Sequence, residues 1–261
     1  MNQTTQSKRK DTQSKPTGAV PIETGPVGIY GKIPAHGDFV SRRLNNDFIR
    51  YWDEWLQRGI ATSQEQLGER WLNHYLVSPI WRFVLSPGVV DDSGWTGVLI
   101  PSVDSVGRYF PLTIAMPVKA PSLLDLFERG RDWFQDIEDS ALAALSDSLS
   151  IDELNDRVLA SEFKLSGDYS CRQNSGDPGA ALQIDMQFPE QSPTTIFPLM
   201  FEKLVRQQYK SYSAWWSQGA EDILPSFNLT SQLPDASMYA SFLDGVWEPR
   251  GWQRSYDLVG C

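Results

Sequence analysis

The sequence has few of the residues on which metal sites and disulfide frameworks depend. Its 261 residues include two cysteines, Cys171 and Cys261, and two histidines, His36 and His74. Their positions give neither a C-x-x-C nor an H-x-x-x-H spacing, so we expect reduced thiols and no structural zinc site. No run approaches 18 apolar residues, and none follows the charged start at residues 8–10. We therefore expect a cytoplasmic protein without a signal peptide or membrane span.

Positive charge and phosphate-binding loops are also scarce. The 23 Lys and Arg residues are outnumbered by 33 Asp and Glu residues, which gives a net charge of −10. An acidic surface repels nucleic-acid backbones and anionic lipids. No G-x-x-x-x-G-K-[ST] or G-x-G-x-x-G pattern occurs, which argues against nucleotide binding. The composition thus disfavours nucleic acid, membranes and nucleotides as general partners.

After a polar N-terminal stretch, the sequence has the composition of a globular protein. Hydrophobic residues make up 41% and aromatic residues 12%, with ten tryptophans, enough for a sizeable core. Residues 1–26 are rich in Gln, Thr, Ser and Lys, and we predict a disordered leader there. Residues 27–261 are predicted to form one domain, in which the polar, glycine-rich stretch 166–179 marks a loop or a seam.

The order of elements indicates an α/β domain. Short links between the predicted strands favour antiparallel pairing, and helices before and after them favour a sheet covered on its faces. Asn46 is the expected N-cap of the first helix, and Ser63 with Gln66 forms the expected capping box of a second. Ser150 with Glu153 forms another capping box. The predicted strands are 27–33, 81–85, 95–100, 109–118, 181–188 and 212–216, and the later helices are 122–145, one from Ser150, 198–209 and 235–243.

Residues 31–40 form the most distinctive segment, because Pro34, His36, Gly37 and Asp38 follow one another in one loop. Proline fixes one backbone angle and glycine allows unusual ones, so the loop has a defined shape. A histidine and a carboxylate two residues apart can share a metal or a substrate. They can equally fix the turn or present a binding surface, which is the reading that we favour.

Other candidate sites have both a functional and a structural interpretation. A Ser102, His36 and Asp104 triad is disfavoured, because Ser102 lacks the G-x-S-x-G elbow. Asp104 and Arg108 form an exposed recognition tip, an internal pair, or both, since the two readings are not exclusive.

Basic and aromatic residues leave the same choice open. Lys32, Arg42 and Arg43 form either a basic patch for an acidic or phosphorylated partner or ordinary solvated charge. Trp247 and Trp252 lie in a polar stretch, where they are interface anchors or strap back onto the core. The remaining tryptophans that lie on predicted element faces are expected in the core, namely Trp52, Trp55, Trp71, Trp81, Trp133, Trp215 and Trp216.

Three segments, taken in order, resemble the TagF (ImpM) family of type VI secretion accessory proteins. They are Gly31-Lys-Ile-Pro-Ala-His-Gly-Asp38, Trp81-Arg-Phe83, and the 101–111 hairpin with Pro101-Ser-Val-Asp104 and Gly107-Arg-Tyr-Phe-Pro111. The resemblance implies a three-layer α/β sandwich with a mixed, largely antiparallel sheet and helices on both faces. It also implies a cytoplasmic, post-translational repressor that binds the forkhead-associated scaffold (Fha) without catalysis. Some relatives carry a fused metal-dependent phosphatase, for which this chain has neither the length nor a D-G-x-G motif.

On this resemblance we expect a non-enzymatic regulator that needs no cofactor or metal. The candidate partner-binding residues are Lys32, His36, Asp38, Arg42, Arg43, Asp104 and Arg108. Two alternatives stay open, a metal-dependent hydrolase that uses the His36 and Asp38 loop, and a structural component associated with the secretion baseplate.

Overall fold

A computed structural model describes residues 22–120, 122–146, 149–164 and 193–253. The predicted leader, the predicted strand 181–188, the seam at 166–179, Cys171 and Cys261 lie outside these residues. The predictions for them stay predictions.

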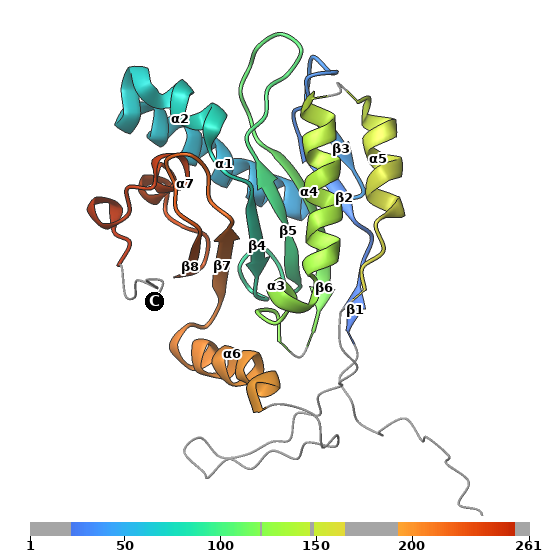
Figure 1. The fold of residues 1–261 in the computed structure, drawn as a ribbon, viewed down its shortest axis with the longest axis vertical. Coiled ribbons are helices and arrows are strands. Elements are labelled where there is room, and N and C mark those ends of the chain that lie inside the picture. Colours follow the sequence, from blue (N-terminus) through green and yellow to red (C-terminus); the bar gives the residue numbers. More distant parts are fainter. Residues whose placement is uncertain (1–21, 121, 147–148, 165–192, 254–261) are drawn as a thin grey trace, which may run out of the picture.

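One antiparallel sheet organises the described part of the chain (Figure 1). Its strand order is β3-β2-β6-β5-β4-β7-β8, and the short β1 pairs with β6. Neighbouring strands pair antiparallel throughout, which confirms the prediction from the short links. The strands are β1 Glu23–Thr24, β2 Gly28–Gly31, β3 Val40–Arg42, β4 Trp81–Leu85, β5 Gly94–Ile100, β6 Leu112–Lys119, β7 Tyr212–Ser217 and β8 Ser226–Ser231.

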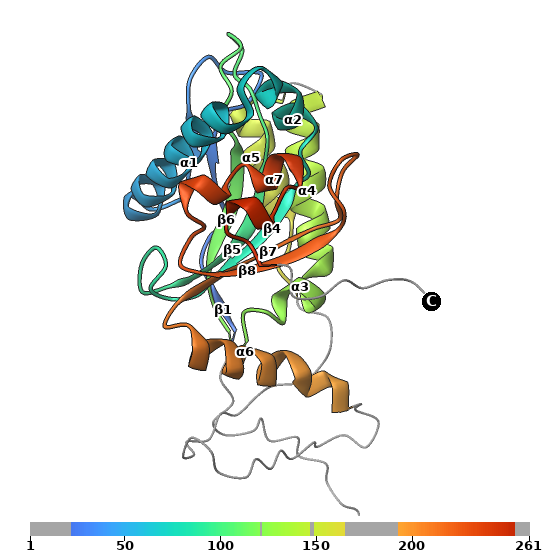
Figure 2. The same ribbon diagram turned by 90° about the vertical axis from the view of Figure 1, so that its left-hand side faces the viewer.

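An aromatic layer covers one face of the sheet. It is built from α1 Asn46–Leu67, α2 Trp71–Val77 and α7 Ser241–Asp244, which lie in front of the sheet in Figure 2. The tryptophans of α1 are buried against the strands, and Trp52 stacks with Trp215 at 6.1 Å between ring centroids. Trp52 also donates its Nε1 hydrogen to Thr113 Oγ1 at 2.8 Å, so a buried polar atom is satisfied within the aromatic core.

A second helical layer covers the other face. It consists of α4 Arg131–Ser146 and α5 Ile151–Ala160. Their apolar residues, such as Phe134, Ile137 and Leu154, form one cluster with Val98 and Ile114 of the sheet. Two buried clusters on opposite faces confirm the expected sandwich with helices on both sides.

Two further helices lie at one end of the sheet. They are α3 Leu126–Arg129 and α6 Phe197–Gln208, and α6 stands at the lower end in both ribbon views (Figures 1 and 2). Within the described residues, no helix has both the length and the apolar character needed to cross a membrane.

Several predicted helix boundaries are wrong. The N-cap of α1 is Asn45 rather than Asn46, since its side chain accepts the Phe48 N–H at 2.6 Å. Ser63 caps no second helix: it is buried inside α1, where its hydroxyl accepts the Trp71 Nε1 hydrogen at 2.9 Å. The predicted helix 122–145 is divided at Gly130 into α3 and α4. The predicted helix 235–243 is a 3-10 turn, Ala236–Met238, followed by α7.

Other local predictions are confirmed. Ser150 and Glu153 form the expected capping box at the start of α5. Trp247 and Trp252 strap back onto the core, because both pack edge-on against Phe242, at 6.1 and 5.7 Å between centroids. The tryptophans expected in the core are buried, except that Trp216 is half-buried.

Candidate functional site

The sequence motifs meet at one end of the sheet, which we call the loop end (residues 32–39 and 101–111). The first segment connects β2 to β3, and the second connects β5 to β6; in Figure 1 both lie at the top. They adjoin because β2 pairs with β6, with Tyr30 opposite Thr113. Gly31 stands at the junction with a φ of +134°, and a Cβ there would lie 2.1 Å from the Pro111 carbonyl oxygen. Only glycine fits this position.

A buried ion pair joins the two segments. Lys32 Nζ lies 2.8 Å from Asp104 Oδ2, and the two side chains are 7% and 0% exposed. The Lys32 ammonium also stands over the Phe39 ring, 5.0 Å from its centroid. Charges removed from water need partners within the protein, and Lys32 and Asp104 are partners 72 residues apart in sequence.

Asp104 has a full set of hydrogen bonds. Besides Lys32, its carboxylate accepts the backbone N–H groups of Val106 (3.1 Å) and Arg108 (2.8 Å), and the Arg108 Nε hydrogen (2.7 Å). Burial by itself would raise the pKa of the Asp104 carboxyl. The hydrogen bonds from Lys32, Arg108 and Val106 outweigh that effect and hold the pKa well below its usual range. Asp104 is thus an ionised anchor of the hairpin.

Two further contacts tie the hairpin to the first loop. The Arg108 guanidinium donates to the Gly37 carbonyl, and the Ser105 N–H donates to the His36 carbonyl at 2.9 Å. The internal Asp104–Arg108 pair predicted as one alternative is therefore present, and it extends across to the neighbouring loop.

The first loop is also fastened to α5. His36 Nε2 accepts the Ile151 N–H at 3.2 Å, which occupies one ring nitrogen of the histidine. Arg42 pairs with Asp152 at 3.0 Å, and Arg43 donates to Asn155 and, at 2.6 Å, to the Val27 carbonyl. Arg43 adopts a φ of +57°, an unusual backbone geometry for a side chain of this size. The basic residues thus hold the start of α5 against β3.

The catalytic triad considered from the sequence does not form. The Ser102 hydroxyl donates to the Lys32 carbonyl at 2.7 Å, and Asp104 is taken by Lys32 and Arg108. The Ser102 backbone N–H donates to the Tyr75 hydroxyl at 3.0 Å. Ser102 therefore links the first loop to α2 rather than presenting a nucleophile.

The part of the chain that the structure describes also offers no group of three or more His, Cys, Asp or Glu side chains placed to hold a metal ion. The Asp38 carboxylate accepts the N–H of its neighbour Phe39 at 2.8 Å. His36 and Asp38 therefore have local structural partners, and the hydrolase alternative gains no support from their geometry.

The exposed surface of the loop end is partly apolar. Phe39 is 42% exposed and rests on Tyr30 (stacked, 5.7 Å) and Phe110 (edge-on, 4.8 Å). Val106, at the tip of the hairpin, is 67% exposed. Asp38, next to Phe39 in the sequence, and Arg108, two residues after Val106, are also exposed. Our sequence reasoning selected only charged residues here and missed Phe39, although an aromatic residue directly after Gly-Asp in a polar loop is a visible signal.

The seven candidate residues thus have three different roles. Lys32 and Asp104 are buried and hold the segments together, while His36, Arg42 and Arg43 fasten them to α5 or to the chain before β2. Asp38 and Arg108 remain on the surface, beside Phe39 and Val106. A partner would therefore meet an aromatic ring and an apolar tip within a charged border.

Comparison with known proteins finds one family model and a similar crystal structure. A model of the TagF N-terminal domain, described as type VI secretion system-associated, matches residues 28–161, which include both loop-end segments. The crystal structure of PA0076 from Pseudomonas aeruginosa PAO1, at 2.05 Å resolution, is similar to this chain with a TM-score of 0.69 and 32% sequence identity. The match covers 90% of this chain and 99% of that one. No curated protein matches this sequence.

Proposed function

The chain belongs to the TagF family of type VI secretion system-associated proteins, and from that premise we propose that it is a negative regulator of type VI secretion. It acts after translation, in the cytoplasm and without catalysis, by binding the forkhead-associated scaffold (Fha) through the loop end. The observation that carries this proposal is the exposure of Phe39, Val106, Asp38 and Arg108 on two segments that a buried ion pair joins.

The geometry of the loop end suits recognition between proteins. Binding energy at interfaces concentrates in a few apolar or arginine anchors, surrounded by polar residues. Phe39 is held by two aromatic neighbours and by the Lys32 ammonium, so little conformational freedom is lost when a partner covers it. Arg108 keeps its guanidinium at the surface although its Nε is bound to Asp104, which leaves planar donors for a carboxylate or phosphate.

The first test is a pulldown with this protein as bait from cells that carry the secretion cluster, in matched buffers with and without a chelator. We expect equal recovery of the scaffold in both buffers. Recovery that depends on metal would favour the hydrolase alternative. Failure of the scaffold to bind, together with stable recovery of baseplate proteins, would favour the structural alternative.

Surface variants then test the placement of the site. We expect Phe39→Ala and Asp38→Ala to weaken scaffold binding, and Phe39→Ala by about 30-fold or more, since an anchor residue contributes about 2 kcal/mol. The matched control is Leu159→Ala on α5, since Leu159 is an apolar residue that is 54% exposed outside the loop end. If both loop variants bind the scaffold as wild type does, the loop end is not the binding surface.

A further inference from the structure

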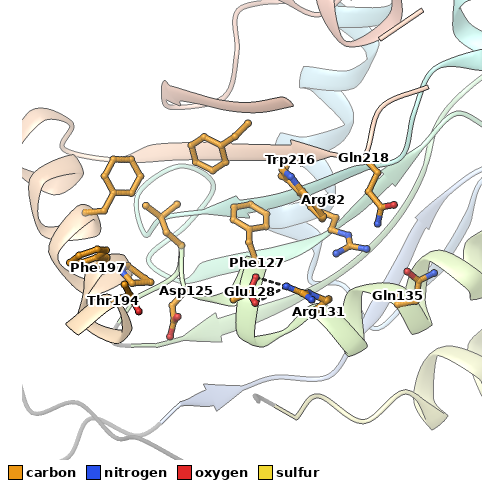
Figure 3. A pocket seen from close by; sticks show the side chains of 14 residues that line it. Arg82, Asp125, Phe127, Glu128, Arg131, Gln135, Thr194, Phe197, Trp216 and Gln218 are labelled. Carbon is orange, nitrogen blue, oxygen red and sulfur yellow. Dashed lines mark hydrogen bonds and ion pairs between the residues drawn. The ribbon is translucent and has the colours of Figure 1, made fainter. Parts of the chain in front are cut away.

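A pocket lies on the face of the sheet that α4 covers, where α3, the start of α4, α6 and the strands β4, β7 and β8 meet (Figure 3). Its volume is about 830 Å³, within the range of about 300–1,000 Å³ that is usual for ligand sites. None of the seven candidate residues of the loop end lines it. It is thus a second feature that the proposed function does not use.

The walls of this pocket combine aromatic and polar side chains. Phe127 packs against Trp216 at 6.5 Å and edge-on against Phe227 at 6.0 Å, and α6 contributes Phe197 and Phe201. In Figure 3, Arg82, Gln135 and Gln218 lie on one side of the pocket, and Asp125 and Thr194 lie on the other side, near Phe197. The aromatic side chains favour insertion of an apolar side chain of a ligand.

Arg82 lines the pocket, and its guanidinium has one hydrogen-bond donor without a partner among the described residues. It is 1% exposed, its Nη2 donates to Glu138 Oε2 at 2.7 Å, and its guanidinium stacks over Trp216 at 4.5 Å. Its Nη1 is one of the buried side-chain polar atoms without a partner in the described part of the chain. An unpaired buried donor is costly, so an oxygen atom brought in by a ligand would satisfy it.

The apolar surface continues beyond the pocket along α6. Phe197, Met200, Phe201 and Leu204 follow an i, i+3, i+4, i+7 spacing, and they are 56%, 36%, 45% and 60% exposed. We call these four residues the α6 stripe. At 1.5 Å per residue it extends about 10 Å along the helix, which is longer than a compact small molecule needs. Contiguous exposed apolar stripes of this kind mark interaction sites.

The charges around the α6 stripe are unbalanced toward positive. Glu202 is buried and pairs with Arg206 at 2.7 Å, and Glu128 pairs with Arg131 at 2.6 Å. Lys203 and Lys210 are exposed and have no ion-pair partner among the described residues. On a chain with a net charge of −10, this is a locally basic border that attracts acidic groups.

From these observations we propose that the pocket and the α6 stripe bind an acidic segment of a partner protein. The segment inserts an apolar side chain between Phe127, Phe201 and Trp216. It lies along the α6 stripe with its carboxylates near Lys203, and one of its oxygen atoms accepts the Arg82 Nη1 hydrogen. A second copy of this chain fits less well, because a symmetric contact over α6 would place Lys203 beside its own counterpart.

The test uses the full-length protein and a fluorescein-labelled helical peptide as the probe. The peptide carries Leu and Phe at i, i+3, i+4 and i+7 and Glu at its other positions, and a matched peptide carries Lys in place of Glu. By fluorescence anisotropy we expect saturable binding of the acidic peptide, weakening as salt is raised, and at least tenfold weaker binding of the basic one. Equal binding of both peptides, or of neither, would overturn the proposal.

Exposed variants show whether the probe occupies the proposed surface. We expect Phe201→Asp and Lys203→Glu each to weaken binding of the acidic peptide by about tenfold while leaving the urea midpoint unchanged. Leu159→Asp, on α5, is the matched control and should bind as wild type does. Unchanged binding in both α6 variants would overturn the proposal. So would a concentration-dependent dimer that Phe201→Asp abolishes, since the surface would then belong to a second copy.

Discussion

Two buried ion pairs, one at the loop end and one beside the pocket, differ in how completely they are satisfied. At the loop end, Asp104 accepts hydrogen bonds from Lys32, Arg108 and the Val106 backbone. Beside the pocket, Glu138 binds two nitrogens of Arg82, and Nη1 of that arginine has no partner in the described residues. The first pair is complete within the chain, whereas the second leaves a donor for another molecule.

This difference separates residues that shape a surface from residues that meet a partner. The saturated loop-end pair fixes two connections against each other, and the proposed recognition there is by the exposed Phe39 and Val106. The Arg82–Glu138 pair also stabilises the fold, but it lies beside the aromatic pocket and the exposed α6 stripe. Some of the substitutions below break the Lys32–Asp104 or the Arg82–Glu138 pair, and others leave both pairs intact. Comparing them distinguishes residues that shape a surface from residues that meet a partner.

The largest effect on stability is expected from Glu138→Leu. Arg82 would stay buried without its counterion, and breaking a buried pair from one side costs about 3–5 kcal/mol. Urea denaturation should show this loss in the free energy of unfolding. The double variant Arg82→Met/Glu138→Leu should recover most of it, because no unpaired charge remains. A single variant as stable as wild type would contradict this assignment.

A smaller loss is expected from Asp104→Asn. Asparagine keeps an oxygen that accepts the Val106 and Arg108 N–H groups, but the buried Lys32 loses its negative partner. The urea midpoint should fall below that of wild type and stay above that of Glu138→Leu. If the urea midpoint of Asp104→Asn lies below that of Glu138→Leu, the Lys32–Asp104 pair contributes more to folding than the Arg82–Glu138 pair.

The loss in Asp104→Asn should depend on pH. The pKa of Asp104 is lower in the folded protein than in the unfolded chain, so its ionisation stabilises the fold above the ordinary aspartate pKa of about 3.9. That stabilisation is lost as the pH falls through the lower, folded-state pKa. The difference between wild type and Asp104→Asn should therefore be constant near neutral pH and shrink below about pH 4. A difference that widens on acidification would contradict the ion pair.

A further, smaller loss is expected from His36→Ala. It removes the acceptor of the Ile151 N–H at the start of α5, and a hydrogen bond of this kind contributes about 1 kcal/mol. His74→Ala is the control, because the His74 side chain on α2 makes no hydrogen bond or ion pair with the described residues. Equal urea midpoints for the two variants would show that His36 does not hold α5.

The smallest effect on stability, and the sharpest on function, is expected from Val106→Asp. Its side chain is 67% exposed, so the free energy of unfolding should change by less than about 0.5 kcal/mol. A buried carboxylate at the contact should nevertheless weaken scaffold binding by at least tenfold, measured by calorimetry. Normal scaffold binding by this variant would exclude the hairpin tip from the interface.

Much of the fold could be predicted from the sequence because its signals are local. Pro87 and Pro101 end the runs that become β4 and β5, and the Ser150 capping box starts α5. The misplaced boundaries depend on distant contacts or on competing local signals. Ser63 has the sequence of a cap, but Trp71 satisfies its hydroxyl inside a continuous α1.

The candidate site could be predicted only in part for the same reason. The loop at residues 31–38 and the Asp104–Arg108 pair follow from neighbouring residues. The Lys32–Asp104 pair joins residues 72 positions apart, and no single-sequence pattern connects them. The roles of Phe39 and Arg82 likewise depend on what surrounds each of them after folding.

The most direct test of the loop end as the binding surface is hydrogen–deuterium exchange of the full-length protein with and without the purified scaffold. We expect the scaffold to slow exchange in residues 34–43 and 101–111, because a partner that covers Phe39 and Val106 shields these backbones. Slowed exchange elsewhere, with both segments unchanged at saturating scaffold, would contradict the proposal.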